Sequence, residues 1–537
     1  MVQRVRHGSE AEAREARGTL ARIGSRAVKP LLDALADDDV SQQRTAIDVL
    51  PYVQNPHAAL PLFTFATGKA DLDLRARAML ACGLLADGSL VAKYATLLFP
   101  TGAESPGAEL GDSVGAAAVW GLARMSSPQA LPLLRRLAFG DRPAAMRALA
   151  ILGLGADHDR ASLSALVGLA TSRDGSPVVR AASIHALGDL NAESEAPALV
   201  EIAEDGDALP RSMALLALAQ LAAAHDVTWE PDAVRAMADA LFSSSPEDTG
   251  NPSWNAAVPR AGAAALTFLA TARGKHDHAT PLGEILPPPD GTPNVETVLE
   301  GLIPSHQAPA ARAAALVKYA EPLERAAIAA LQTSSESARR ALDALGGGEG
   351  QLTAFAPYGA KGPEVQAARV ITAGLLPSIV ALARHPDPQM RARALALLGH
   401  WSDDAAVDAV VGGLEDPVEE VRRVALASLG TTSSGGVVAP STARAVRALG
   451  GILERDENWA MRVLAAQALG RLGQTDRAGA VAELTGAITR DPYALVREAS
   501  LEALASFDPD GARPMARTVA ATDPEPRVRE AAANMAR

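Results

Sequence analysis

Aspartate and arginine recur along the chain six positions apart, and such a pair could form part of an active site. Catalysis, however, requires one unique cluster of groups, whereas these charges recur once per segment of the chain. We therefore interpret them as a structural ladder of charged hydrogen bonds and predict that none of them is catalytic. The pairs that define the pattern are Asp38/Arg44, Asp174/Arg180, Asp205/Arg211, Asp416/Arg422, Asp456/Arg462, Asp491/Arg497 and Asp523/Arg529.

Two histidine motifs and one cysteine have side chains that could also do chemistry. His276 and His278 flank an aspartate and are weak candidates for a zinc site that lacks further ligands. The sequence Asp157-His158-Asp159 contains the residues of a catalytic dyad, but its place between two expected helices favours capping and a turn. Cys82 is the only cysteine and lies in an apolar segment, which favours a buried thiol. We therefore expect no metal, no cofactor and no enzymatic activity.

Composition favours helices and disfavours nucleic acid as a partner. Of the 537 residues, 48% are hydrophobic but only 3% aromatic, so the apolar content is mostly Ala and Leu, which suit helix-on-helix packing. The net charge of −13 has the wrong sign for binding phosphates. No run approaches the ~18 apolar residues of a membrane span, so we expect no membrane insertion. The chain starts without an apolar leader, and we expect a cytoplasmic protein.

The elements that position these charges are expected to be pairs of helices. Neighbouring arginines such as Arg391, Arg422 and Arg462 lie 31 or 40 residues apart, which is room for two helices and two turns. In the segment 416–430, Asp416-Pro417 is a helix-start signal, because Asp caps free amides and Pro suits the first turn. Gly430 is expected to end that helix in the left-handed conformation. Each unit is therefore predicted to be a helical hairpin.

The Asp-x5-Arg spacing, followed by a small residue and Leu-Gly as in Ser428-Leu429-Gly430, resembles HEAT repeats, in particular the short repeats named after phycobilisome lyases. The resemblance covers nearly the whole chain. It implies an all-α fold, a right-handed α-solenoid of about fourteen to fifteen HEAT-like helical hairpins. In such a solenoid the second helix of each hairpin lines the concave side, and the ladder connects successive repeats.

Irregular segments interrupt the repeat pattern and suggest three parts of one continuous solenoid. We predict an N-terminal arc over 1–242, an irregular Pro/Gly-rich insertion with a degenerate repeat over 243–306, and a C-terminal arc over 307–537. Long insertions in compact folds are often functional. Candidates for contacts with a partner are therefore Trp254 in this insertion and Phe355 and Tyr358 in a second, Gly-rich irregular segment at 346–363.

The helix face opposite the packed one carries the remaining candidates. Counted from the repeat arginine, positions +1, +5 and +8 fall on this face and are mostly small, which would let the backbone of a partner approach closely. Near the end of the chain the face becomes acidic, which indicates either a binding site or a solvated cap. The polar candidates on this face are His185, Gln467, Glu498, Glu502 and Glu530.

These observations favour a non-enzymatic scaffold that binds a protein or peptide partner along the concave solenoid surface. One alternative, implied by the resemblance, is a HEAT-like lyase or a chaperone for a chromophore or other cofactor. Another is a structural subunit of a larger complex. The acidic balance speaks against the DNA-glycosylase type of HEAT-like enzyme.

Overall fold

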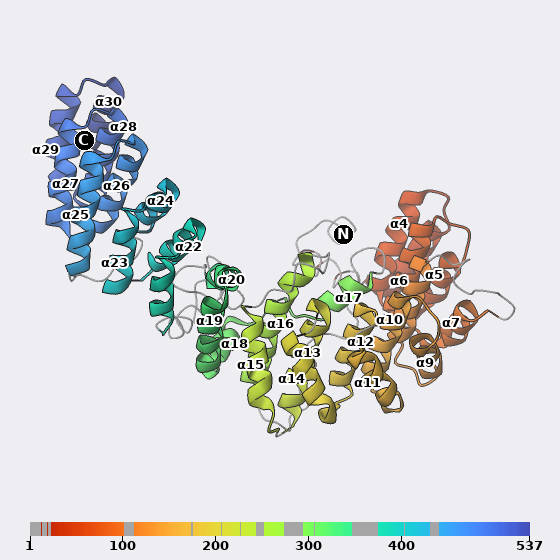
Figure 1. Ribbon diagram of the computed structural model, residues 1–537. Helices are drawn as coiled ribbons and strands as arrows, with labels where there is room; N and C mark the ends of the chain where they lie inside the picture. Colours follow the sequence, from red (N-terminus) through yellow and green to blue (C-terminus); the bar gives the residue numbers. More distant parts are fainter. Residues whose placement is uncertain are drawn as a thin grey trace. The chain divides into compact units, whose positions relative to one another are not determined.

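Every regular element that the structure describes is a helix (Figure 1). The computed structural model describes residues 23–100, 112–172, 175–205, 207–225, 227–242, 252–272, 294–305, 307–345, 374–401, 403–429 and 440–536, together with Glu12, Glu15 and Thr19. The chain divides into two compact units, which we call unit 1 (Met1–Ala311) and unit 2 (Arg312–Arg537). The border lies within one helix, α18 (Pro309–Lys318). The three-part division at 242 and 306 stays a prediction.

Unit 1 is a row of helical hairpins. The second helices of consecutive hairpins pack directly on one another from α6 to α16, and each first helix packs against its own second helix. Short 3-10 turns precede several first helices, for example Gly88–Leu90 before α7. The helices of unit 1 are α3 (Val28–Leu35), α4 (Val40–Val49), α5 (Ala59–Ala66), α6 (Leu72–Leu85), α7 (Val91–Leu98), α8 (Asp112–Ala123), α9 (Leu131–Phe139), α10 (Ala144–Ala156), α11 (Leu163–Thr171), α12 (Pro177–Asp189), α13 (Ala196–Asp205), α14 (Ala208–Ala224), α15 (Glu230–Ala240), α16 (Pro252–Thr271) and α17 (Val295–Gly301).

Unit 2 repeats the same arrangement. Its second helices α22, α24, α26, α28 and α30 pack on one another in chain order, and its first helices α23, α25 and α27 form a second row. The helices of unit 2 are α19 (Ala320–Thr333), α20 (Ser335–Leu345), a helical segment at 374–382, α22 (Pro388–Leu398), α23 (Asp404–Gly413), α24 (Glu419–Ser428), α25 (Pro440–Arg455), α26 (Trp459–Leu472), α27 (Arg477–Arg490), α28 (Ala494–Phe507), α29 (Pro509–Thr522) and α30 (Pro526–Met535). The predicted all-α solenoid is confirmed.

The glycine of the Leu-Gly pattern allows second helices to approach closely. A Cβ atom added at Gly83 would lie 2.6 Å from the Cα of Gly121 on the next second helix, and one at Gly470 would lie 3.0 Å from the Cβ of Ala503. At Gly399, which has the same place in the preceding repeat as Gly430, φ is −57° and the backbone is not left-handed. Gly430 lies outside the described residues. The missing side chain, and not a special backbone angle, is what the pattern requires here.

In three repeats of unit 2, those of α24, α28 and α30, the Asp-Pro pair lies before the helix and not in its first turn, whereas Asp387 caps α22 and Pro388 is its first residue. The Oδ1 atom of Asp416 accepts a hydrogen bond from the amide of Val418 at 2.9 Å, and α24 begins only at Glu419. Asp491 and Asp523 make the same contact with the residue two places on. The expected place of Pro417 within the helix is therefore wrong, because the aspartate forms a tight turn that leads into the helix.

No helix in the described ranges has the length and apolar character needed to cross a bilayer.

Candidate partner-binding surface

Three repeat arginines of unit 2 bind the aspartate of the next repeat with two nitrogens each. The Nε and Nη2 atoms of Arg462 donate to Asp491 at 2.8 and 3.1 Å, and those of Arg497 donate to Asp523 at 2.8 and 2.7 Å. Arg391 binds Asp416 in the same way, at 2.7 and 2.9 Å. These guanidinium groups hold the pKa of Asp416 and of Asp523 below its ordinary value.

The third nitrogen of these arginines explains the spacing of six. The Nη1 atom of Arg462 donates to the backbone carbonyl of Asp456 at 2.7 Å, and that of Arg497 donates to the carbonyl of Asp491 at 2.9 Å. Each arginine therefore ties its own turn to the turn of the following repeat. Arg422 and Arg529 make the same carbonyl contacts with Asp416 and Asp523.

The arginines of unit 1 are bound differently. The Nε atoms of Arg75, Arg147 and Arg211 donate to carbonyls near the end of the first helix in the same hairpin, those of Ala66, Ala138 and Ala203. Two others meet an aspartate through one nitrogen: Arg44 binds Asp73 at 3.1 Å and Arg180 binds Asp207 at 3.1 Å.

For several aspartates of the predicted ladder, the structure shows another contact or does not describe the side chain. Asp39, not Asp38, accepts the amide of Ser41 and caps α4. Asp456 accepts the amide of Asn458. Asp174 and the side chain of Asp205 lie outside the described residues, and the contact that Arg180 makes is with Asp207 instead. The spacing in the sequence thus identifies the arginines more reliably than the carboxylates that bind them.

The residue five places after each repeat arginine, which we call the fifth-position residue, distinguishes the two units. In unit 1 these residues are buried: Val49, Leu80, Leu152, His185 and Leu216. In unit 2 they are exposed: Ala396, Ala427, Gln467, Glu502 and Asn534. His185, a predicted partner-binding residue, is enclosed in unit 1 with its Nε2 atom 3.5 Å from Asp189.

Helix α17 covers part of this surface in unit 1. It packs on the second helices α10 and α12, beside which it lies in Figure 1. Its side chains Val298 and Leu299 are fully buried, and so are Leu302 and Ile303 directly after it. Because α17 belongs to the predicted irregular insertion, the chain itself occupies a surface that the sequence analysis assigned to a partner.

In unit 2 the corresponding surface contains an open cleft between α26 and α28. Its volume is about 370 Å³. The floor is made of small residues, since Gly470 meets Ala503 at close range. Two residues predicted from the sequence, Gln467 and Glu502, line the same cleft. The complete lining is Gln467, Gly470, Arg471, Gln474, Ala499, Glu502, Ala503 and Ser506.

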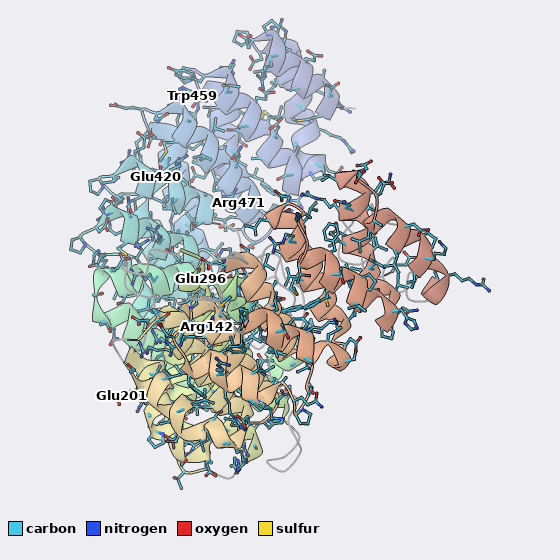
Figure 2. All side chains as sticks on the ribbon, turned by 90° about the vertical axis from the view of Figure 1, so that its right-hand side faces the viewer. Arg142, Glu201, Glu296, Glu420, Trp459 and Arg471 are labelled. Atoms are coloured by element: carbon cyan, nitrogen blue, oxygen red, sulfur yellow. The ribbon has the colours of Figure 1, made fainter. Side chains whose placement is uncertain are left out.

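Arg471 also lines the cleft and was not among the candidates predicted from the sequence. It lies at the end of α26, away from Trp459 at the start of that helix (Figure 2). Its nitrogens donate to the carbonyls of Leu426, Ala427 and Leu429 at the end of α24, at 3.0 to 3.2 Å. Burial lowers the pKa of this guanidinium. The positive charge of Arg471 is favourable at the carbonyl end of α24. The same side chain contributes a cation to the wall of the cleft.

The other predicted candidates are dispersed. The Glu498 carboxylate lies 2.8 Å from the Nε atom of Arg527, and Glu530 is exposed on α30. Trp254 belongs to α16, but its side chain lies outside the described residues. Phe355, Tyr358, His276 and His278 also lie outside them. Within the described ranges, no three side chains of His, Cys, Asp or Glu gather where they could hold a metal ion.

The remaining reactive groups are used structurally. The Asp159 carboxylate accepts from the Nε atom of Arg135 at 2.8 Å and from the Ser162 hydroxyl, and these hydrogen bonds lower its pKa. His158 adopts a left-handed turn, with φ of 52°, and its Nδ1 atom lies 2.8 Å from the carbonyl oxygen of Asp189. The Cys82 thiol is buried, which raises its pKa to about 11. A thiol with this pKa is a poor nucleophile near neutral pH.

Comparison with known proteins agrees with this geometry. The family model for HEAT repeats matches residues 138–219, 376–449 and 446–537. These three segments of the chain consist of HEAT repeats. The matched segments include α10 to α13 in unit 1 and α22 to α30 in unit 2, which contain most of the ladder. A comparison with curated proteins gives no match.

Comparison with solved structures finds similarity to Kap95p and Kap121p. One is a structure of Kap95p with RanGDP, at 16% identity and a TM-score of 0.42, with 94% of this chain and 69% of that chain covered. Two others are Kap121p bound to Pho4p, at 11% identity and a TM-score of 0.49, and Kap121p bound to Nup53p, at 12% and 0.48. The aligned regions cover 99% of this chain but 54% and 55% of those chains, so the chain spans about half the length of Kap121p.

Proposed function

We propose that this chain is a non-enzymatic scaffold, and that it binds an extended peptide or a protein segment on the second-helix surface of unit 2. The observation that supports this proposal is the cleft between α26 and α28, which lies on exposed fifth-position residues. In unit 1, α17 packs on the second helices α10 and α12, and the surface of this unit is not part of the proposal.

The lining of the cleft suits a peptide main chain. A small floor at Gly470, Ala499 and Ala503 lets a backbone approach the helices closely. Along its walls, Gln467 and Gln474 offer amide donors and acceptors, which match the N–H and C=O groups of an extended chain.

The charges of the cleft add side-chain selectivity. Arg471 and Glu502 both line it, and neither forms an ion pair among the contacts of the described residues. Two nitrogens of Arg471 are bound by backbone carbonyls, but no carboxylate neutralises its charge, which can attract an acidic group of the partner. We expect bound peptides to carry an acidic residue near Arg471 and a basic or polar residue near Glu502.

Selection from a displayed library of random 15-residue peptides, with the full chain as bait, tests this function. We expect selected peptides to bind about tenfold more weakly to a Gln467→Ala, Gln474→Ala double variant, since two pairs of main-chain hydrogen bonds are lost. The matched control is Gln332→Ala, an exposed glutamine on α19. Selected peptides that bind the double variant as tightly as the unchanged chain, or a library that yields none, would contradict the proposal.

A further inference from the structure

Two aromatic side chains are exposed side by side at one edge of unit 2. Trp459 is the first residue of α26, and Tyr493 directly precedes α28. Their ring centroids lie 6.3 Å apart with an interplanar angle of 17°, so the rings are stacked. They are 39% and 49% exposed, although exposed aromatic groups cost hydration free energy. We call this pair the aromatic edge.

The ladder holds the aromatic edge in place. The amide of Tyr493 donates to Asp491, which is bound by Arg462, and the guanidinium carbon of Arg462 lies 5.3 Å from the centre of the Tyr493 ring. On the other side, Asn458 caps α26 through the amide of Ala460. Side chains anchored in this way lose little conformational freedom when a partner binds, so more of the contact energy remains for affinity.

Three glutamates near the aromatic edge form no ion pair among the described residues. The Asn458 amide donates to Glu419 at 3.1 Å, which places that carboxylate next to Trp459, and Glu457 lies two residues before Trp459. In the next repeat, Glu525 takes the position that Tyr493 has in its own, two residues after the ladder aspartate. Within the described part of unit 2, no lysine or arginine nitrogen forms an ion pair with these three glutamates.

Two nearby arginines already have carboxylate partners. Arg462 binds Asp491, and Arg423 at the start of α24 pairs with Glu420. Figure 2 labels Glu420 and Trp459 on the same side of unit 2, away from Arg471. The charge that this edge lacks is therefore positive. Trp and Tyr faces attract a guanidinium or an ammonium group, and a rim of carboxylates strengthens that attraction.

We propose that the aromatic edge binds an arginine- or lysine-rich segment of a partner protein. One basic side chain stacks on Trp459 and Tyr493, and its neighbours along an extended segment pair with Glu457, Glu419 and Glu525. This surface is separate from the cleft, because Trp459 and Arg471 are twelve residues apart on α26, or about 18 Å at 1.5 Å per residue. This proposal therefore does not depend on whether the cleft binds a peptide.

Fluorescence anisotropy with two labelled dodecapeptides tests the proposal on the full chain. One peptide alternates arginine with serine, and the other alternates glutamate with serine. We expect only the arginine peptide to bind, about tenfold more weakly to Trp459→Ala and unchanged in affinity to Tyr493→Phe, which keeps the ring. A Glu457→Gln, Glu525→Gln variant should bind severalfold more weakly and with a smaller dependence on salt.

Two controls separate this site from general attraction to an acidic protein. Leu72→Ala removes a large exposed side chain in unit 1 and should leave binding unchanged. The Gln467→Ala, Gln474→Ala variant of the cleft should also bind the arginine peptide normally, whatever the outcome of the peptide selection. Equal binding of the arginine peptide to Trp459→Ala and to the unchanged chain, or equal binding of the two peptides, would overturn the proposal.

Discussion

Units 1 and 2 share one repeat and use it in two ways. In unit 1 the fifth-position residues are buried, and α17 packs on α10 and α12. In unit 2 the same positions are exposed and border a cleft. The repeat itself therefore does not decide whether a solenoid surface is available to a partner. On α10 and α12, a later segment of the same chain packs on the second helices.

The ladder differs between the units as well. In unit 2 the arginines bind the next repeat through buried carboxylates, whereas in unit 1 three of them bind carbonyls of their own hairpin. Unit 2 thus relies on charged pairs between repeats. Unit 1 relies more on apolar contacts: α14 is buried along nearly its whole length, from Ala208 to Ala223. The predictions that follow test this contrast.

The largest expected effect is the loss of a buried ladder arginine in unit 2. Arg497 and Asp523 are 8% and 4% exposed, so Arg497→Ala leaves a buried carboxylate without its cation. We expect the free energy of unfolding of α28 to α30 to fall by about 3 kcal/mol or more, measured by hydrogen exchange. Arg44→Ala in unit 1 is the control, since Arg44 and Asp73 are 45% and 38% exposed and their pair is worth at most about 1 kcal/mol. Equal effects at both sites would remove the contrast.

The next effect concerns the cover of unit 1. Leu299→Ala in α17 removes a fully buried side chain and should destabilise the packing of α17 by about 2–5 kcal/mol. Hydrogen exchange in α10 and α12 should then become faster, because these helices lose their cover. The matched control is Leu72→Ala, since Leu72 is exposed. Unchanged exchange in α10 and α12 would show that α17 does not protect this surface.

A smaller effect, equal in both units, is expected at the glycines. Gly83→Ala and Gly470→Ala each place a Cβ against the next second helix and should cost about 1–3 kcal/mol in thermal or urea unfolding. Gly168→Ala in α11 is the control, because a Cβ there meets nothing within 4 Å. It should be neutral or stabilising by up to about 1 kcal/mol. A tolerated Gly470→Ala would argue against close packing in unit 2.

The smallest effect is the response to acid. Asp416 and Asp523 in unit 2 have lowered pKa values, so their contribution to stability is present above the ordinary pKa of about 4 and is lost as the pH falls below it. In unit 1, burial raises the pKa of Asp157 and of Asp239, so their protonation relieves a destabilising charge. The lowered pKa of Asp159 acts in the opposite direction there.

We therefore expect unit 2 to lose stability on acidification to about pH 4 and below before unit 1 does. Hydrogen exchange at several pH values, corrected for the intrinsic rate, measures this for each unit. Asp523→Asn should remove part of the acid response of α28 to α30 and leave that of unit 1 unchanged. Simultaneous loss in both units would contradict the assignment of the acid response to the ladder.

Much of the fold could be predicted because its signals are local. The spacing between Asp and Arg follows from contacts within one turn, since Arg462 reaches the carbonyl of Asp456 six residues before it. Gln467 and Glu502 were correctly placed on one face by helix geometry alone, and both line the cleft. Arg471 was missed because its partners, the carbonyls at the end of α24, lie more than forty residues away in the sequence.

The sequence by itself determined the hairpins, their order and the arginines of the ladder, because helix periodicity and turn contacts act over a few residues. Tertiary structure alone decided which surfaces stay open. A segment more than one hundred residues later, α17, packs on α10 and α12, and the role of the glycines depends on the distance to the next helix. Neither follows from local pattern, because both are set by what packs across the repeats.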